Sequence, residues 1–363
     1  MKKVTEKRGR AMTYLVGQSV LQIKAGAPNN GRGEDNRGMV KQFTAGREVF
    51  PYVSAQAARR WLRDSMPSAE PLSPVIRSGE GKKQQAYTKG RPDQFLDDDL
   101  FGYMIAVKAD DKGAKKGESK TFMRDTVLAT GTLVAVVPNR PVMDFGTMSR
   151  GFEPGTNPVI HEHEMYTADL AGDLLLDLPR VGTFETGGKT IKAALPPSVA
   201  AELLEGGAEE TVLREVQCVR LPIGERRRRV AVLLRTMAEV RGGAKQSAHY
   251  GDRTPGLVIL APVRGGVNPF TRIVRERDRK TYFDAGILRE ELEAWADELD
   301  GPVRIGWAPG FLGDQRERAR TDLKDLIEAG TVILGHPRTV LGDLAKEFTD
   351  GGHDDWFDDS SGS

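Results

Sequence analysis

The chain has 363 residues, so it can form one large domain or two ordinary ones around a substantial hydrophobic core. Its net charge of +1 gives no overall basic excess for nucleic acid, and its single cysteine, Cys218, excludes an intrachain disulfide and suits a reducing compartment. No apolar run reaches the ~18 residues of a membrane span, and the basic N-terminus lacks the apolar segment of a secretory signal, so we expect a cytoplasmic protein with no membrane contact.

The predicted secondary structure mixes strands and helices without a regular alternation, which favours an α+β fold over a doubly wound sheet. Short or alternating apolar runs predict strands, and helical apolar periods predict helices, the first of which is capped by Ser54. In chain order, we expect strands at residues 14–23, 103–107, 126–137, 211–219, 230–236, 257–263 and 332–334, and helices at 54–64, 196–204, 285–300 and 316–329.

Several segments interrupt this pattern. Residues 67–93 are rich in Pro, Gly, Lys and Gln, residues 108–120 form a Lys, Gly and Asp loop, and residues 138–158 are rich in Pro and Gly. The acidic end of the chain, which is also rich in Gly and Ser, is predicted to be a disordered tail covering residues 346–363.

The charge is distributed unevenly along the chain. Residues 1–63 contain 13 Lys and Arg against 4 Asp and Glu, whereas residues 297–363 contain 7 against 15. Opposite charges at the two ends suit electrostatic steering or head-to-tail packing of copies of the chain, although charged tails are also common without such a role.

Residues 18–64 combine three kinds of group that contact RNA: an apolar strand, a loop of small and amide residues, and the entry to a helix. Glycine lets a backbone approach a phosphate closely, asparagine and arginine supply donors, and a helix start offers N–H groups to an anion. On the predicted helix, Arg59 and Arg63 lie one turn apart on one side, and Arg60 falls on a neighbouring face. The candidate donors are Lys24, Asn29, Asn30, Arg32, Asn36, Arg37, Ser54, Gln56, Arg59, Arg60 and Arg63.

Three further segments have two interpretations each. The apolar side chains of residues 138–158 could slip between unstacked bases, which is worth ~1–3 kcal/mol per base for aromatics, or could belong to a hairpin that packs onto its own domain. The turn at residues 242–246 presents Lys245 and Gln246 either as a plain turn or as a contact to an RNA backbone. The run of four arginines at 226–229 is interpreted as a solvated entrance to the predicted strand at 230–236, with a phosphate contact as the alternative.

The motifs for catalysis are incomplete. A phosphate-binding loop ending at residues 188–190 would need a glycine at position 183, which is threonine, so a hairpin turn through Gly187-Gly188 is preferred. Cys218 lies in an apolar strand pattern, where a buried and inert thiol is expected. Neither a triphosphatase nor a thiol enzyme is therefore predicted.

A histidine motif at residues 161–164 leaves an enzymatic alternative open. On a strand, His161 and His163 share a face and could ligate one metal ion, although a polar edge strand with solvated or RNA-facing imidazoles explains them better and the rest of a cupin motif is missing. A ribonuclease using His161, His163 or His249 as general acid or base also stays open, because sequence spacing alone does not bring these residues together.

At these residues the chain resembles the CRISPR-associated autoregulator DevR family, the backbone subunit of type I effector complexes (Cascade). The order of the motifs is that of the family, and Asp144-Phe145-Gly146 ahead of His161 is most like the type I-B branch. The segments that carry the resemblance are residues 27–31 (APNNG), 51–60 (PYVSAQAARR), 98–104 (DDLFGYM), 157–166 (NPVIHEHEMY) and 242–246 (GGAKQ).

The resemblance implies an α+β fold with an RRM-like (ferredoxin-like) palm, a finger-like insertion and a projecting thumb hairpin. The palm would be discontinuous, from residues 1–66 and 121–345, with the insertion at 67–120 and the thumb at 139–165. Residues 297–363 match no motif of the family.

The resemblance also implies a function. Several copies would stack head to tail along the crRNA, clamp its backbone and displace bases periodically with their thumbs, so that the guide pairs with target DNA. The implied partners are crRNA, target DNA through the guide heteroduplex, other copies of the chain and other Cascade subunits. No catalytic residue, cofactor or metal is predicted, although a related class of subunit cuts RNA with a loop aspartate, which keeps Asp35 and Asp144 in view. The predicted RNA contacts add Lys245 and Gln246 to the donors above, and the predicted thumb residues are Arg140, Met143, Phe145, Met148, Arg150, Phe152 and His161.

Overall fold

The computed structural model of the chain describes residues 12–31, 33, 37–79, 84–107, 120–148, 159–187 and 192–358. Its centre is a ten-stranded sheet that mixes parallel and antiparallel pairs, and with the helices it confirms the α+β class. The sheet strands are β1 (Thr13–Gly26), β2 (Gln42–Ala45), β3 (Glu48–Val53), β8 (Leu128–Thr130), β9 (Leu133–Ala135), β10 (Val142–Met148), β11 (Val159–Asp177), β15 (Leu257–Arg264), β18 (Val303–Trp307) and β19 (Val332–Gly335).

The sheet order is β19-β18-β15-β1-β11-β9-β3-β2, and β8 and β10 also pair with β11. Only β18 and β19 pair in parallel among the described strands. Four small two- or three-stranded sheets flank this centre, formed by β4 (Val75–Ser78) with β5 (Gln85–Thr88), β6 (Tyr103–Val107) with β7 (Lys120–Arg124), β12 (Thr183–Gly187) with β13 (Glu209–Leu213) and β14 (Val216–Arg220), and β16 (Val274–Arg277) with β17 (Lys280–Phe283).

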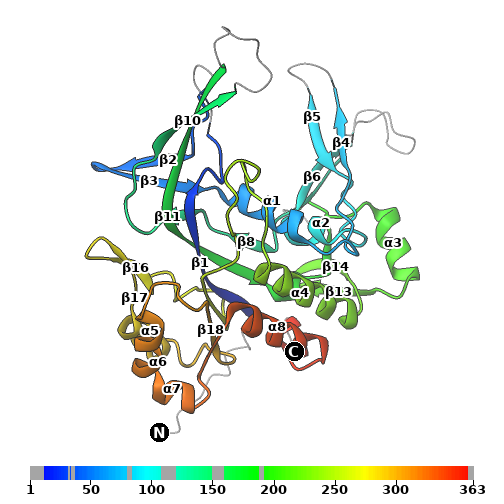
Figure 1. Ribbon diagram of the computed structural model, residues 1–363. Helices are drawn as coiled ribbons and strands as arrows, with labels where there is room; N and C mark the ends of the chain where they lie inside the picture. The colour runs from blue at the N-terminus through cyan, green and yellow to red at the C-terminus, as the bar shows by residue number, and fades with distance from the viewer. Residues whose placement is uncertain are drawn as a thin grey trace.

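Helices cover both faces of the sheet (Figure 1). The described helices are α1 (Ala55–Ser65), α2 (Leu96–Phe101), α3 (Pro197–Glu205), α4 (Ile223–Ala238), α5 (Ala285–Ala294), α6 (Gln315–Asp322), α7 (Lys324–Glu328) and α8 (Pro337–Thr349), with short 3-10 turns η2 (Leu178–Arg180) and η3 (Asp354–Phe357).

Alternation along β1 and β15 divides the core into two clusters. Leu15 packs with α4 and α8, whereas its neighbour Val16 packs with α5 and the residues around Trp307. Val258 and Ile259 of β15 separate in the same way. Because successive side chains of a strand point to opposite faces, a central strand buried on both faces favours a continuous apolar run. β15 has such a run from Leu257 to Val263, whereas Gln18 and Ser19 interrupt the apolar residues of β1.

The strand β11 is longer than the sheet that it crosses. Its later residues pair with β1, from Ala168 to Asp177, while its first residues pair with β10. The hairpin of β10 and β11 therefore extends beyond the sheet and projects from the molecule on the same side as the β4–β5 hairpin (Figure 1). It occupies the place of the hairpin expected at residues 139–165, whose connection, residues 149–158, lies outside the described residues.

The strand predicted at residues 230–236 is wrong, because these residues lie within α4. A five-residue apolar run, residues 230–234, does not distinguish a buried helix from a buried strand, and here all five side chains of the run are buried. The arginine run before it was consequently misinterpreted as a solvated strand entrance, since Arg226 and Arg229 are buried side chains of the same helix.

Other boundaries differ in smaller ways. The strand expected at 126–137 is two strands, β8 and β9, and the one at 211–219 is the hairpin β13–β14, which turns at Arg214 and Glu215 with positive φ. The helix expected at 285–300 ends at Ala294, and the one at 316–329 is divided into α6 and α7. The N-cap at Ser54 is confirmed, because its Oγ accepts a hydrogen bond from the Ala57 N–H at 3.3 Å.

The prediction of a disordered tail at 346–363 is wrong for the residues that the structure describes. The helix α8 continues to Thr349, and the turn η3 buries Trp356 and Phe357 in the main core. Two aromatic side chains outweigh the acidic composition, because each buries a large apolar surface. Residues 359–363 lie outside the described residues.

The segment expected to be an insertion, residues 67–120, is anchored in the core through α2. Asp99 is fully buried, and its Oδ1 accepts from Arg124 Nη2 at 2.5 Å while its Oδ2 accepts from Arg229 Nη1 at 2.6 Å and from the Gly182 N–H at 3.0 Å. This carboxylate therefore links α2 to β7, α4 and the start of β12.

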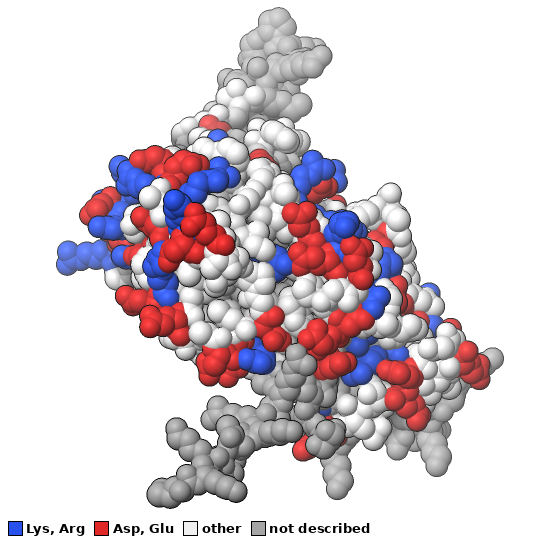
Figure 2. All heavy atoms as spheres, turned by 90° about the horizontal axis from the view of Figure 1, so that it is seen from below, with Lys and Arg blue, Asp and Glu red and all other residues white. Residues whose placement is uncertain are grey.

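Charges of one sign do not dominate the face shown in Figure 2. There Lys and Arg are interspersed with Asp and Glu. Arginines pair with carboxylates of residues 297–363, as in Arg227–Asp354 and Arg289–Asp325. None of the helices within the described residues is both long and apolar enough to cross a bilayer.

Candidate nucleic-acid interface

Three segments that are distant in the sequence meet beside the root of the β10–β11 hairpin. The Asn29 side-chain oxygen accepts a hydrogen bond from the Ser54 N–H at 2.9 Å, which ties the amide-rich loop to the start of α1. The Pro28 carbonyl accepts from the Ala244 N–H at 2.9 Å, which ties the same loop to the glycine turn after α4. The structure thus brings together the loop, the helix start and the turn that were predicted separately, with Asn29 in a structural position.

The glycine turn needs its glycines. Gly242 and Gly243 have φ of 105° and 95°, a region that other residues rarely adopt. A Cβ on Gly243 would lie 3.3 Å from Trp61 Cε2 and from the Pro28 oxygen. Gln246 closes the turn, because its Nε2 donates to the Gly251 oxygen and its Oε1 accepts from the Gly251 N–H, both at 3.1 Å. Gln246 is therefore a staple of the loop, and Lys245 is the exposed group of the predicted pair.

The arginines of α1 differ in what they contact. Arg60 is exposed and pairs with Asp64. Arg59 is partly buried and its Nη1 donates to Thr130 Oγ1 at 3.2 Å. Arg63 pairs with Asp97, whose side chain is only 3% exposed, and lies 4.6 Å from the Phe101 ring centroid. The one-turn spacing that suggested a shared RNA-facing pair therefore places Arg63 toward the core, where it has a structural role.

The remaining predicted donors are distributed around this face. Lys24, Asn30 and Gln56 are exposed, whereas Arg37 is exposed but paired with Glu162 at 2.8 Å. The backbone beside Arg37 follows β11, since the Gly38 N–H donates to the Glu162 oxygen at 2.9 Å. Arg32 and Asn36 lie outside the described residues.

A cleft of about 530 Å³ opens next to Lys24 and the loop that follows the glycine turn. Tyr250, 89% exposed, lines it and offers a ring face to solvent. An exposed aromatic beside a lysine is an arrangement that can stack a base and hold a phosphate. Tyr250 was not predicted from the sequence. The only local indication of its role is that it is an aromatic residue within a polar, glycine-containing loop. The cleft is lined by Gln22, Lys24, Tyr250, Gly251, Asp252, Thr254, Pro255, Gly256, Ala308, Pro309, Gly310 and Phe311.

The β10–β11 hairpin presents apolar side chains to solvent. Phe145 is 64% exposed, and Val142, Met143 and Ile160 are also exposed. His161 is exposed too and stands against Gly146, where an added Cβ would lie 2.6 Å from its Nε2. Arg140 is exposed at the base of the hairpin. Of the other predicted thumb residues, Arg150, Phe152 and the side chain of Met148 lie outside the described part of the structure.

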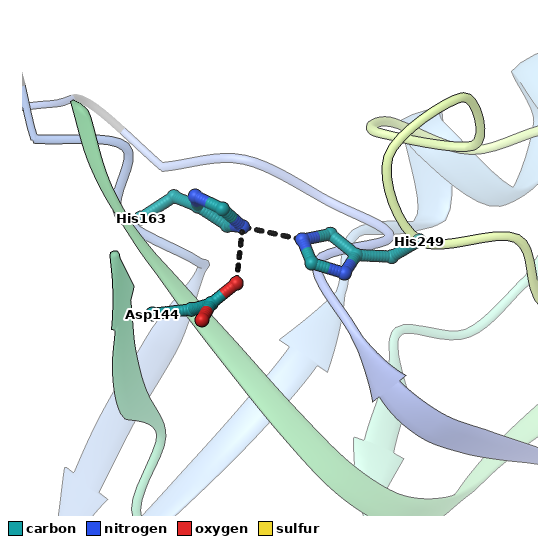
Figure 3. A group of neighbouring side chains, drawn as sticks. All are labelled: Asp144, His163 and His249. Carbon is teal, nitrogen blue, oxygen red and sulfur yellow. Dashed lines mark hydrogen bonds and ion pairs between the residues drawn. The ribbon is translucent and has the colours of Figure 1, made fainter. Parts of the chain in front are cut away.

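At the root of the hairpin, His163 of β11 meets His249 of the loop 239–256 and Asp144 of β10 (Figure 3). The two imidazoles contact each other through their Nε2 atoms, and Asp144 Oδ2 lies 3.4 Å from the same nitrogen of His163. Burial is the main reason that the pKa of His163 lies below its ordinary value; His249 adds to this effect and Asp144 opposes it. These surroundings disfavour the protonated form of His163.

The two histidines that suggested a metal site, His161 and His163, therefore lie in different surroundings. His163 is buried in this cluster, whereas His161 is exposed along the hairpin. The carboxylate of Glu164 accepts from the Val40 N–H at 2.9 Å and holds the neighbouring loop. The thiol of Cys218 is buried, as expected, and burial raises its pKa to about 11.

Comparison with known proteins reveals similarity at the level of structure alone. No known family model and no curated protein matches the sequence. Two solved structures resemble the whole fold: a chain of a "CRISPR RNA-guided surveillance complex", at 13% identity and a TM-score of 0.50, covers 92% of this chain and 98% of its own length. A chain of a "CRISPR RNA-guided surveillance complex, pre-nicking", at 11% identity and a TM-score of 0.50, covers 92% of this chain and 100% of its own. At such identities the likeness establishes a shared fold.

Proposed function

We propose that this chain is a non-catalytic, RNA-binding backbone subunit of a type I CRISPR surveillance complex (Cascade), of the DevR family and its type I-B branch, acting in the cytoplasm. An RRM-like palm holds the crRNA backbone, and copies of the chain pack head to tail along it. The β10–β11 hairpin is the thumb that reaches the RNA of the neighbouring copy and displaces a base, which leaves the other bases to pair with target DNA. Other subunits of the complex complete the set of partners.

One observation carries this proposal: a projecting apolar hairpin rises directly beside a face where three loops present polar donors. The exposed groups of that face are Lys24, Lys245 and Tyr250. Single-stranded RNA held for its backbone needs donors for phosphates and flat side chains for bases, and both kinds lie here. The whole-length likeness to chains of surveillance complexes gives independent support.

A binding titration with labelled single-stranded RNA of guide length tests the proposal. Tyr250→Ala should weaken binding by about 1–3 kcal/mol, the usual value of one stacked base. Lys24→Ala and Lys245→Ala should each lower the slope of log affinity against log salt by about 0.7, because each removes one phosphate contact.

The matched control is Lys324→Ala on α7, an exposed lysine away from this face, which should leave the slope unchanged. Equal binding by all four variants and the parent chain would contradict the assigned face. In the presence of RNA, native mass spectrometry should resolve a ladder of chain multiples; a single copy on RNA of any length would remove the head-to-tail arrangement from the proposal.

The His163–His249 pair favours one alternative, an RNA endonuclease. Two neighbouring imidazoles can act as general acid and base, or can hold a metal ion that activates water. Incubating guide-length RNA with the purified chain, with and without EDTA, separates the two functions. Intact RNA in both samples supports the scaffold, whereas products that disappear in the His249→Ala variant support the enzyme.

A further inference from the structure

We propose that Asp144, His163 and His249 bind a divalent transition-metal ion of the Zn²⁺ class, which fastens the root of the β10–β11 hairpin to the loop 239–256. The three side chains come from three segments, and their ligand atoms all lie within 4.8 Å of one another. Figure 3 shows the His249 imidazole and the Asp144 carboxylate both directed at the same ring nitrogen of His163, its Nε2. This inference does not rest on the proposed RNA-binding function.

Counting protons at this point shows why a cation fits. His163 Nε2 has two close neighbours, His249 Nε2 and Asp144 Oδ2. If His163 Nε2 carries a proton, that proton can satisfy only one of the two neighbours well. If His249 supplies the proton instead, the carboxylate faces a lone pair of His163. A cation between the three groups accepts all three electron pairs at once.

The donor set selects the class of metal. Two imidazole nitrogens and one carboxylate oxygen suit zinc and its neighbours, whereas Mg²⁺ and Ca²⁺ prefer oxygen alone. Bonds of 2.0–2.1 Å in a tetrahedron place ligand atoms about 3.3 Å apart. The 3.4 Å between Asp144 Oδ2 and His163 Nε2 matches this spacing, whereas the two imidazole nitrogens lie closer together and would move apart around an ion. Three protein ligands leave one position open, as in many zinc sites that also bind water or a substrate oxygen.

The surroundings hold the buried ligand in place. His163 is buried in β11, and its Cβ lies 3.2 Å from where a Cβ on Gly38 would stand, so the backbone of that loop packs directly against it. Lys245 lowers the pKa of His163 through its positive charge, so it opposes a cation here and the carboxylate of Asp144 offsets it. The ion would join the hairpin to the loop that carries Lys245 and Tyr250.

Zinc content measures the proposal directly. The untagged chain is stripped with EDTA, given Zn²⁺, dialysed and analysed for zinc by elemental mass spectrometry. The parent chain should retain one zinc ion, and Mg²⁺ should not compete. Loss of an outer-shell partner alone costs about 10–100-fold in metal affinity, so His249→Ala should bind zinc at least ~100-fold more weakly in competition with a chromophoric chelator. Asp144→Asn should also weaken binding.

His161→Ala is the matched control, because His161 lies on the same strand but is exposed and outside the cluster. It should retain zinc as the parent does. His249 lies on a loop, so its variant should fold, and circular dichroism checks this. Zinc should also slow amide hydrogen exchange in β10 and in residues 243–250. A parent chain that retains no zinc, or equal retention by the parent and His249→Ala, would overturn the site.

Discussion

The arginines of α4 and the polar groups beside the β10–β11 hairpin were both candidates for contacts with RNA phosphates, but the structure places them in different surroundings. Arg226 of the basic run donates to the carbonyl oxygens of Val181 at 2.8 Å and of Pro179 at 2.9 Å. Burial lowers its pKa to about 9. On the face beside the hairpin, Lys24 and Lys245 do not belong to a run of basic residues, yet both side chains are exposed.

The comparison teaches that local charge density does not locate an interface. An arginine has five donors and a long apolar stem, so it can be buried when carbonyls and carboxylates surround it. In this chain Arg124, Arg226 and Arg229 are buried. Arg124 and Arg229 join β7 and α4 to α2 through Asp99, and Arg226 joins α4 to the carbonyls of Pro179 and Val181. We expect substitutions of buried charges to change the stability of the fold, and substitutions of exposed charges on this face to change RNA binding.

The largest effect is expected for Asp99→Ala. This change leaves Arg124 and Arg229 buried without their shared carboxylate, which should lower the free energy of unfolding by about 3–5 kcal/mol in urea denaturation. Asp64→Ala is the control, because it removes only the exposed pair with Arg60 and should cost less than ~1 kcal/mol. Similar losses in both variants would contradict the distinction between buried and exposed pairs.

Gly243→Ala should come next, with a loss of about 1–3 kcal/mol from backbone strain and crowding against Trp61. Gly310→Ala is matched to it, because φ is also positive there (78°) but no atom lies within 4 Å of the added Cβ. The difference between the two isolates the packing at the glycine turn. If the turn positions Lys245, RNA affinity should fall for Gly243→Ala but not for Gly310→Ala. Equal stability of the two variants would contradict a role for packing against Trp61.

Arg63→Ala and Lys245→Ala should have opposite effects on fold stability and on RNA binding. Arg63→Ala removes the pair with Asp97 and the contact with Phe101, so it should destabilise the fold by about 1–2 kcal/mol while the folded protein still binds RNA. Lys245→Ala should leave the melting temperature unchanged and weaken RNA binding at low salt. Thermal melts and binding titrations on both variants decide this, and a reversed pattern would place Arg63 at the interface after all.

The smallest effect concerns pH. Burial acts to raise the pKa of Glu225, but hydrogen bonds and ion pairs with Arg228 and Arg229 outweigh it, and the folded pKa lies below the ordinary value. A lowered carboxyl pKa stabilises the fold above the unfolded value, ~4.5, and this contribution is lost as pH falls through the folded pKa. Glu225→Gln should therefore be less stable than the parent at pH 7, and the difference should shrink as pH falls below the unfolded pKa. A stability difference between the parent and Glu225→Gln that widens on acidification would contradict this prediction.

The sequence determined those elements whose pattern is local. The alternating or short apolar runs at residues 14–23 and 257–263 predicted strands, and Ser54 before a helical period predicted the start of α1, because pleat alternation and capping act over a few residues. For the segment around Phe145, the residues alone left exposed apolar side chains and a hairpin packed onto its own domain as alternatives, and only the family resemblance implied a projecting hairpin. The candidates His163 and His249 were also named from sequence, each by itself.

Only the tertiary structure decided where these pieces lie. It turned residues 230–236 into a helix, folded Trp356 into the core, directed Arg63 inward and brought His163, His249 and Asp144 to one point. Each outcome depends on what surrounds a side chain, since burial, counter-charge and packing are supplied by segments far along the chain. A local pattern indicates which secondary structure a segment prefers, but the segments that pack against it determine the free energy of its contacts.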